Sequence, residues 1–193
     1  MIVFTGPLAA GKTSVKKTLI NILTGFKIPF AEILTLKDLE LPFAVKKGLI
    51  KSQGQYSRQQ ITDLMKKLYS RYGKSLGTAL LYRYLKDKEK DKIYIIDSKR
   101  NPEGLAQLEK YFNNVLIVGV TATTKERLDR FKKRKRLLDL KISDPLLIFF
   151  REEKIFNVSG SLALCDLLIE NHKLLPNEFE VKLFSSLVQS GFI

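Results

Sequence analysis

Residues 6–13 read Gly-Pro-Leu-Ala-Ala-Gly-Lys-Thr, and this stretch decides the fold of the 193-residue chain. Its glycines let the backbone turn successive N–H groups toward one anion, so such a loop can surround phosphate oxygens. The apolar residues 2–4 precede the loop and predict a buried strand, and residues 13–23 predict an amphipathic helix. A strand, a loop of this spacing and a helix in this order indicate a binding site for a nucleoside triphosphate.

The loop positions have separate expected roles. Lys12 is expected to reach the β- and γ-phosphates, and the hydroxyl of Thr13 is expected to ligate Mg²⁺. The positive end of the helix dipole adds to the attraction. The residues of this region expected to bind ATP are Gly6, Ala9, Ala10, Gly11, Lys12, Thr13 and Ser14. The loop alone does not separate kinases from GTPases, motor ATPases or helicases.

Strand-like and helix-like patterns alternate along the rest of the chain. The predicted strands are residues 2–4, 28–34, 93–97, 115–120 and 166–170. The predicted helices are residues 13–23, two within 57–87 that are divided at Gly73, and 102–112, 123–136, 144–154 and 176–189. Ser57 and Gln60 have the spacing of a capping box at the start of the first helix in 57–87. This alternation predicts an α/β three-layer sandwich around a five-stranded, mostly parallel sheet, with residues 1–193 as one domain.

The composition predicts a soluble, cytoplasmic protein with an anionic partner. Basic residues outnumber acidic ones by 34 to 20, which gives a formal net charge of +14. Phosphorylated small molecules, nucleic acid and acidic surfaces would all fit that charge, and a lysine-rich solvated surface would explain it without a ligand. The single cysteine, Cys165, cannot form an internal disulfide. No stretch approaches the roughly 18 apolar residues that a membrane span requires.

Charged residues gather where a third predicted strand ends. Asp97 closes that strand at an edge of the sheet where ligands bind, and its carboxylate can hold Mg²⁺ through water or support the attacking oxygen. A helix-capping role is the alternative. Arg100, after Ser98 and Lys99, can bind the phosphate of an acceptor in a bidentate manner, or remain a solvated loop charge. Arg58 can reach the same phosphate or simply cover the surface.

The predicted helix 123–136 is strongly basic. Arg127, Arg130 and Arg134 follow one another at i, i+3 and i+7, so they share one sector of the helix surface. These guanidinium groups can converge on one polyphosphate, and phosphoryl transfer depends mainly on positioning and charge neutralisation. A solvated basic face and a nucleic-acid contact strip are the alternatives.

Taken together, these passages resemble a known group of proteins. The passages are residues 5–13, 56–74, 127–136, 144–145, 151–153 and 165–171, together with 95–103, which read Ile-Ile-Asp-Ser-Lys-Arg-Asn-Pro-Glu. The last is similar to Ile-Asp-Gly-Ile-Arg-Asn-Pro-x-Glu in nucleoside-monophosphate-kinase-like P-loop proteins. The resemblance is strongest to the dephospho-CoA-kinase-related and deoxynucleoside-monophosphate-kinase-like proteins of archaea and viruses.

The resemblance implies roles for several residues. Arg100 would contact the acceptor phosphate, Arg130 and Arg134 would be arginines of a lid at about residues 125–142, and Asn171 would lie near the nucleotide base. The acceptor would bind a helical region at about residues 36–90. The chain departs from the family in residues 36–48, where lysines are the basic residues, at Ser98, which replaces a glycine, and at Lys135, which replaces a lid glycine.

The sequence therefore predicts an enzyme that transfers a phosphoryl group from Mg·ATP to a small phosphorylated acceptor, first of all a (deoxy)nucleoside monophosphate. The expected catalytic residues are Lys12, Asp97, Arg100, Arg130 and Arg134. Arg58 and Arg100 are expected to bind the acceptor, and Thr13 and Asp97 the metal. The expected assembly is a monomer or homodimer without a membrane partner. The alternatives are transfer to a hydroxyl, as in dephospho-CoA kinases, a nucleic-acid-binding ATPase or regulator, and a degenerate kinase kept for partner binding.

Overall fold

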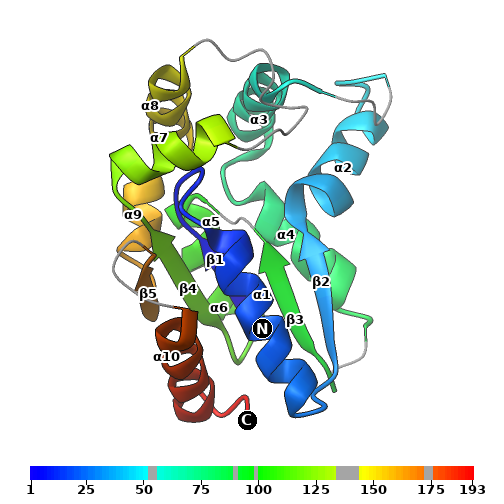
Figure 1. Cartoon of the computed structure of the whole chain (residues 1–193). Helices are drawn as coiled ribbons and strands as arrows, with labels where there is room; N and C mark the ends of the chain where they lie inside the picture. The colour runs from blue at the N-terminus through cyan, green and yellow to red at the C-terminus, as the bar shows by residue number, and fades with distance from the viewer. Residues whose placement is uncertain (52–55, 89–90, 98–99, 134–143, 172–175) are drawn as a thin grey trace.

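The computed structural model describes residues 1–51, 56–88, 91–97, 100–133, 144–171 and 176–193 (Figure 1). Within these residues, five strands form one sheet: β1 (Ile2–Thr5), β2 (Phe30–Leu34), β3 (Ile93–Asp97), β4 (Leu116–Thr121) and β5 (Leu167–Glu170). Their order is β2-β3-β1-β4-β5, and every pair of neighbours is parallel. The predicted five-stranded sheet is confirmed.

Helices cover both faces of the sheet. One face packs against α1 (Lys12–Gly25) and α10 (Pro176–Gln189), and the other against α4 (Leu76–Leu85), α5 (Pro102–Ala106) and α6 (Leu108–Tyr111). Side chains of β1 alternate between the two faces: Phe4 packs with α1 and α10, whereas Val3 packs with α4, α5 and α6. The predicted three-layer sandwich is therefore confirmed. No helix in the described ranges is long and apolar enough to cross a membrane.

A further group of helices lies beyond the carboxyl ends of the strands. They are the π-helix η1 (Thr35–Glu40), α2 (Leu41–Lys46), α3 (Arg58–Tyr72), α7 (Thr124–Lys133) and α8 (Pro145–Phe156). The short helix α9 (Val158–Leu162) packs against α5, β1 and β4. Figure 1 shows α2 and α3 on one side of the loop between β1 and α1, and α7 and α8 on the other. The loop thus lies between two groups of helices that can hold different ligands.

Local sequence explains most of the helix boundaries. The capping box at α3 is confirmed, because the backbone N–H of Gln60 donates to Ser57 Oγ and that of Ser57 to Gln60 Oε1, at 3.3 and 2.8 Å. Asp144 caps α8 where a helix was predicted to begin. The predicted helix 102–112 is instead two short helices that meet at Gln107. The predicted end of the basic helix, residues 134–136, lies outside the described residues.

The central position of β1 places the loop. β1 pairs with β3 on one side and with β4 on the other, and Thr5 is level with Gly119. The chain after Thr5 therefore leaves the sheet between the ends of β3 and β4, where the strand order reverses. Ligands of parallel α/β sheets bind at such a switch point.

Gly6, the first loop residue, lies against the backbone of β4. Its φ is 127°, and a Cβ atom at this position would lie 2.1 Å from the carbonyl oxygen of Val120. We expect Gly6→Ala to lower the free energy of unfolding by about 2 kcal/mol or more, because it adds backbone strain and a steric clash that no rotamer change removes. Urea unfolding followed by circular dichroism measures this loss.

Gly25→Ala is the matched control for this experiment. No atom lies within 4 Å of a Cβ added at Gly25, and its backbone is not in the left-handed region. This variant should be equal to the wild type or more stable by up to about 1 kcal/mol, because alanine restricts the unfolded chain. Equal unfolding midpoints for the two variants would contradict the proposed contact between the loop and β4.

Candidate functional site

The loop between β1 and α1 has the backbone of an anion-binding turn. Gly6, Ala9 and Gly11 have φ angles of 127°, 63° and 101°, so left-handed residues recur along it. The first N–H groups of α1, which begins at Lys12, have no carbonyl acceptor within the helix. A backbone of this kind can direct several N–H groups at one phosphate.

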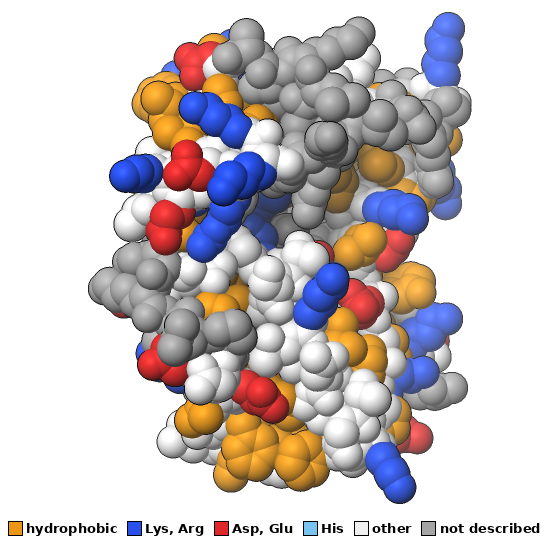
Figure 2. Space-filling model, in the orientation of Figure 1, with side chains coloured by type: hydrophobic (Ala, Val, Ile, Leu, Met, Phe, Trp, Pro, Cys, Tyr) orange, Lys and Arg blue, Asp and Glu red, His pale blue; other side chains and the backbone are white. Residues whose placement is uncertain are grey.

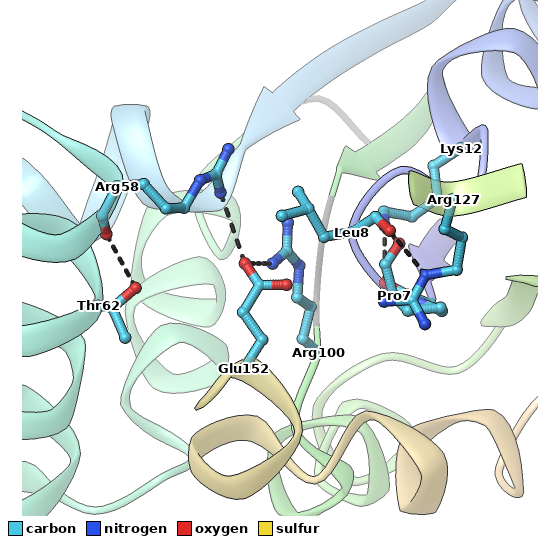
Figure 3. A network of polar contacts seen from close by, with 9 residues as sticks. Pro7, Leu8, Lys12, Arg58, Thr62, Arg100, Arg127 and Glu152 are labelled. Carbon is cyan, nitrogen blue, oxygen red and sulfur yellow. Dashed lines mark hydrogen bonds and ion pairs between the residues drawn. The ribbon is translucent and has the colours of Figure 1, made fainter. Parts of the chain in front are cut away.

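Lys12 lies across the loop and is 8% exposed. Its Nζ donates to the carbonyl oxygens of Gly6 and Pro7, at 2.6 and 2.9 Å (Figure 3). Burial, together with the positive charge of nearby Arg100, holds the pKa of Lys12 well below its usual range. The ammonium group is therefore in a place where the negative charge of a phosphate would stabilise it strongly.

Side chains of α7 and of the chain after β5 hold the other side of the loop. Arg127 Nε donates to the carbonyl oxygen of Leu8 at 2.9 Å, and Arg130 Nη1 donates to that of Ala10 at 3.0 Å. Asn171 Nδ2 also donates to Ala10, at 2.7 Å, and its own carbonyl accepts from Arg130 Nη2 at 2.9 Å. The structure thus places Arg130 and Asn171 directly on the loop backbone.

The contact between Asn171 and the loop requires a glycine at position 11. A Cβ atom there would lie 1.8 Å from Asn171 Nδ2, and the residue has a positive φ. Thr13 and Ser14 follow in the first turn of α1 and are exposed, so their hydroxyl groups are accessible to a ligand of the loop. Figure 2 shows Lys and Arg side chains over α7, beside a hollow in this face of the molecule.

Asp97, at the end of β3, is held by an ion pair that the sequence did not predict. Lys16 Nζ lies 3.0 Å from Asp97 Oδ2 and 2.6 Å from Glu32 Oε2. Burial lowers the pKa of Lys16, but its hydrogen bonds to Glu32 and Asp97 outweigh this effect and the net shift is upward. Thr35 Oγ1 also donates to the carbonyl oxygen of Asp97 at 3.0 Å. The carboxylate is therefore fixed beside the loop.

The position of Lys16 along α1 indicates, from the sequence alone, that this lysine has an acidic partner. It lies four residues after Lys12, next to the buried residues Val15 and Leu19. A lysine on the buried side of a helix needs an acidic partner, because an unpaired charge is costly to bury.

A pocket between η1, α3 and α8 brings the two predicted acceptor arginines together. Arg100 Nη1 lies 2.8 Å from Glu152 Oε1, and Arg58 Nη1 lies 3.5 Å from the same oxygen (Figure 3). Only 4% of the Glu152 side chain is exposed, against 11% for Arg58 and 16% for Arg100. The pocket is lined by Thr35, Leu36, Glu40, Arg58, Ile61, Thr62, Met65, Tyr69, Arg100, Glu152 and Phe156. We call it the arginine pocket.

Glu152 was missed as a site residue, although the sequence carries a signal for it. It lies on α8 four residues after Ile148 and four before Phe156, both of which are buried. Residues four apart share one face of a helix, so the spacing places a carboxylate on an apolar, buried stripe. A carboxylate in that place needs basic partners, and Arg58 and Arg100 are those partners.

The backbone around Arg100 is fixed by its neighbours. Ser161 Oγ donates to the carbonyl oxygen of Arg100 at 2.6 Å. The next residue, Asn101, caps α5 by accepting from Gly104 N and donates from Nδ2 to the hydroxyl of Tyr69 at 3.2 Å. Burial raises the pKa of Tyr69 above its ordinary value, so the hydroxyl stays protonated and can itself donate. Ser161 and Asn101 thus fix the backbone on either side of Arg100, which lines the pocket.

The predicted residues therefore divide into three groups. Lys12 lies within electrostatic reach of Arg100 and Asp97, and Arg58 reaches Arg100 through Glu152. Arg130 and Asn171 lie on the opposite side of the loop. Arg134, Ser98 and Lys99 lie outside the described residues. Burial raises the pKa of Cys165 to about 12, so this thiol stays protonated at neutral pH.

The residues present fit a triphosphate and its metal. The loop offers left-handed backbone turns and a buried lysine for the phosphates, and Thr13 and Asp97 offer oxygen ligands. In the described part of the chain, no group of three or more His, Cys, Asp or Glu residues could hold a metal alone. Mg²⁺ is commonly bound by one or two protein groups together with substrate phosphates.

Comparisons with known proteins agree with the fold. No protein-family model matches the chain. It is 29% identical to UPF0200 protein TV0279 of Thermoplasma volcanium over 92 residues, which are 48% of this chain and 51% of that protein. It is 31% identical to UPF0200 protein Ta0179 of Thermoplasma acidophilum over 77 residues, which are 40% and 42% of the two chains. The chain thus spans about half the length of the curated relatives it matches.

Two solved structures are similar over nearly the whole chain. The shikimate kinase from Bacteroides thetaiotaomicron has a TM-score of 0.53 and 15% identity, and the match covers 97% of this chain and 96% of that one. The shikimate kinase from Acinetobacter baumannii, in complex with shikimate, has a TM-score of 0.54 and 14% identity over 100% and 94% of the two chains. The chain shares its overall fold with these two shikimate kinases, and in this chain the fold is an all-parallel sheet with helices on both faces.

Proposed function

We propose that this chain is a kinase that transfers the γ-phosphoryl group of Mg·ATP to a small phosphorylated acceptor, with a (deoxy)nucleoside monophosphate as the first candidate. One observation carries the proposal: a second pocket, lined by two arginines, lies beside the phosphate loop. Arg100, which lines the arginine pocket, is close enough to Lys12 to lower the pKa of that lysine. A hydrolase that activates water needs no such second site, whereas a kinase must hold an acceptor there.

The proposed division of roles follows the positions of the side chains. The loop and Lys12 would bind the donor phosphates, and Thr13 and Asp97 would hold Mg²⁺, which neutralises charge on the β- and γ-phosphates. Arg58 and Arg100 would orient the acceptor. Arg130, which contacts the loop carbonyl of Ala10, and Arg134 would neutralise charge in the transition state.

A hydroxyl acceptor without a nucleoside is the second candidate. Glu152 places a buried negative charge between Arg58 and Arg100, and the buried Glu40 adds a second carboxylate to the lining. The arginine pocket is therefore less positive than two arginines alone would make it. A doubly charged phosphate gains less from such a pocket than from two unpaired guanidinium groups. A panel of phosphorylated and hydroxylated acceptors separates the two candidates.

The direct test is ADP release from Mg·ATP with a panel of nucleoside monophosphates, dephospho-CoA and small hydroxylated acids. We expect one acceptor class to stimulate ADP release. We expect Arg100→Lys to lower kcat/KM for that acceptor by about 10- to 100-fold, because lysine keeps the charge but loses the bidentate geometry. The dissociation constant for ATP should change by less than about threefold, because Arg100 is assigned to the acceptor.

Arg71→Lys is the control for this variant, since Arg71 is an exposed residue of α3 that lies 5.5 Å from the Tyr72 ring. It should leave kcat/KM unchanged. If ATP binds and no acceptor stimulates ADP release, the kinase assignment is wrong.

The state of Lys12 gives a second test. Burial and Arg100 lower the pKa of Lys12 in the free protein, whereas the charge of a bound phosphate raises it. The protein should therefore take up protons when it binds a nucleotide. The uptake should grow as the pH rises through the lowered pKa toward the ordinary value for lysine. Calorimetric titration with Mg·ATP at pH 8.5, in buffers of different ionisation enthalpy, measures the number of protons bound.

Lys12→Arg is the control for proton uptake. Arginine stays charged at every pH used, so this variant should bind Mg·ATP without the additional uptake. The same uptake in both proteins would show that another group supplies it.

A further inference from the structure

Two buried atoms of the arginine pocket have no hydrogen-bond partner among the described residues. One is Oε2 of Glu152, whose residue is 3% exposed, and the other is Nε of Arg100. Both side chains line the pocket. Buried polar atoms are nearly always paired, so an unpaired acceptor and an unpaired donor in one pocket point to a missing partner.

The ion pair between these residues leaves the two atoms available. Arginine and carboxylate groups often meet through two parallel hydrogen bonds. Here a single oxygen, Oε1 of Glu152, serves both Arg100 at 2.8 Å and Arg58 at 3.5 Å. Figure 3 shows the other carboxylate oxygen without a contact to the residues drawn. The carboxylate therefore fixes both guanidinium groups with one oxygen and retains the second for another group.

We propose that the acceptor presents an anionic oxygen and a hydroxyl group side by side, the oxygen to Arg100 Nε and the hydroxyl to Glu152 Oε2. This inference rests on the proposed function where it assigns the arginine pocket to the acceptor. Such a pair of groups occurs in a hydrogen phosphate, where P–OH adjoins P–O⁻, and in a carboxylate with a neighbouring hydroxyl group. In both, the ligand matches the unpaired acceptor and donor of the pocket.

Glu152 then determines specificity and does not merely support the arginines. An anion without a hydroxyl group would place its negative charge next to Oε2 with no proton between them. Like charges in contact disfavour binding, whereas a hydroxyl group placed there donates to the carboxylate. Because a site built to pair with a hydroxyl group rejects ligands that lack one, the pocket selects hydroxylated anions over bare anions.

Four small anions test this inference at pH 8, where hydrogen phosphate carries a hydroxyl group and sulfate, of equal charge and similar shape, carries none. Glycolate and acetate form the corresponding pair of carboxylates. Each is titrated into the protein while the Nε–H signal of Arg100 is followed by NMR, so the dissociation constant belongs to the arginine pocket. The signal is assigned by its disappearance in Arg100→Lys.

We expect the hydroxylated member of one pair to bind about tenfold more tightly than its partner. A preference for phosphate over sulfate identifies a hydrogen phosphate group as the ligand chemistry, and a preference for glycolate over acetate identifies a hydroxy acid. If neither pair shows a preference above about twofold, or if none of the anions shifts the signal, the inference is wrong.

Glu152→Gln tests the role of the carboxylate. It keeps the size of the side chain and removes its charge, so sulfate or acetate should bind more tightly and the preference should fall to about twofold or less. Glu153→Gln is the matched control. Glu153 lies on the same helix and accepts from the backbone of Ser159 at 3.1 Å, so the variant has the same net charge but an intact pocket. Its preference should equal that of the wild type.

The outcomes separate this inference from the proposed function. The titrations need neither ATP nor turnover, so a preference that depends on Glu152 supports the inference even if no acceptor stimulates ADP release. If an acceptor stimulates ADP release but the titrations show no preference, the kinase assignment stands and the proposed selectivity for hydroxylated anions is wrong. Should Glu152→Gln fail to fold, as judged by circular dichroism, the wild-type preferences alone decide the matter.

Discussion

The candidate site depends on one constraint, the outward orientation of the carbonyl groups of the phosphate loop. The carbonyls of Gly6 and Pro7 accept from Lys12, that of Leu8 from Arg127, and that of Ala10 from Arg130 and Asn171. These donors come from α1, from α7 and from the chain after β5. Once the carbonyls are paired in this way, N–H groups of the loop can face an anion, because each peptide unit directs its two polar groups in opposite directions. The N–H of Ala10 instead donates to the carbonyl oxygen of Pro7 at 3.3 Å.

The same pairing concentrates positive charge, and the structure offsets it with the buried carboxylate of Glu152 and the half-buried one of Asp97. Lys12 is surrounded by Arg100 and Arg127, which lower its pKa, and by Glu152 and Asp97, which act in the opposite direction. Lys16 holds Asp97, and Arg58 joins Arg100 on Glu152. Two cation–carboxylate groups thus flank the loop. Each can exchange a contact within the protein for one with a ligand, at a smaller desolvation cost than for isolated buried charges.

The sequence predicted the sheet and the loop because both produce strong local patterns. Residues 93–97 are a continuous apolar run that ends in a carboxylate, and the loop has fixed glycine, lysine and threonine positions. Order within the sheet and exact parallelism came only from the structure, since strand pairing is not local. The five-residue helix α9 is too short for a periodic pattern, and it follows the N-cap residue Asn157, whose φ of 49° lies in the left-handed region. η1 also lacks the 3.6-residue period, because it is a π-helix.

The candidate site was predicted less completely, for a physical reason. Arginines and lysines at loop ends and helix starts suggested anion binding, and the structure brings Arg58, Arg100 and Lys12 into one region. The acidic residue that joins the two arginines, Glu152, lies far away in the sequence. Its partners cannot be assigned before the fold is known, although helix periodicity suggests that it is buried.

Helix α8 links the two halves of the site. Leu8, in the phosphate loop, packs with Phe131 of α7 and with Ile148 and Phe149 of α8. Arg127 lies 4.2 Å from the Phe149 ring while it donates to the Leu8 carbonyl. One turn after Ile148, the same helix presents Glu152 to the arginine pocket. A displacement of the loop by a donor phosphate would therefore act on α8 through close-packed side chains, and a rigid helix would carry it to the carboxylate that orients the arginines. A phosphate loop and an arginine pocket joined in this way need no separate element to keep them in register.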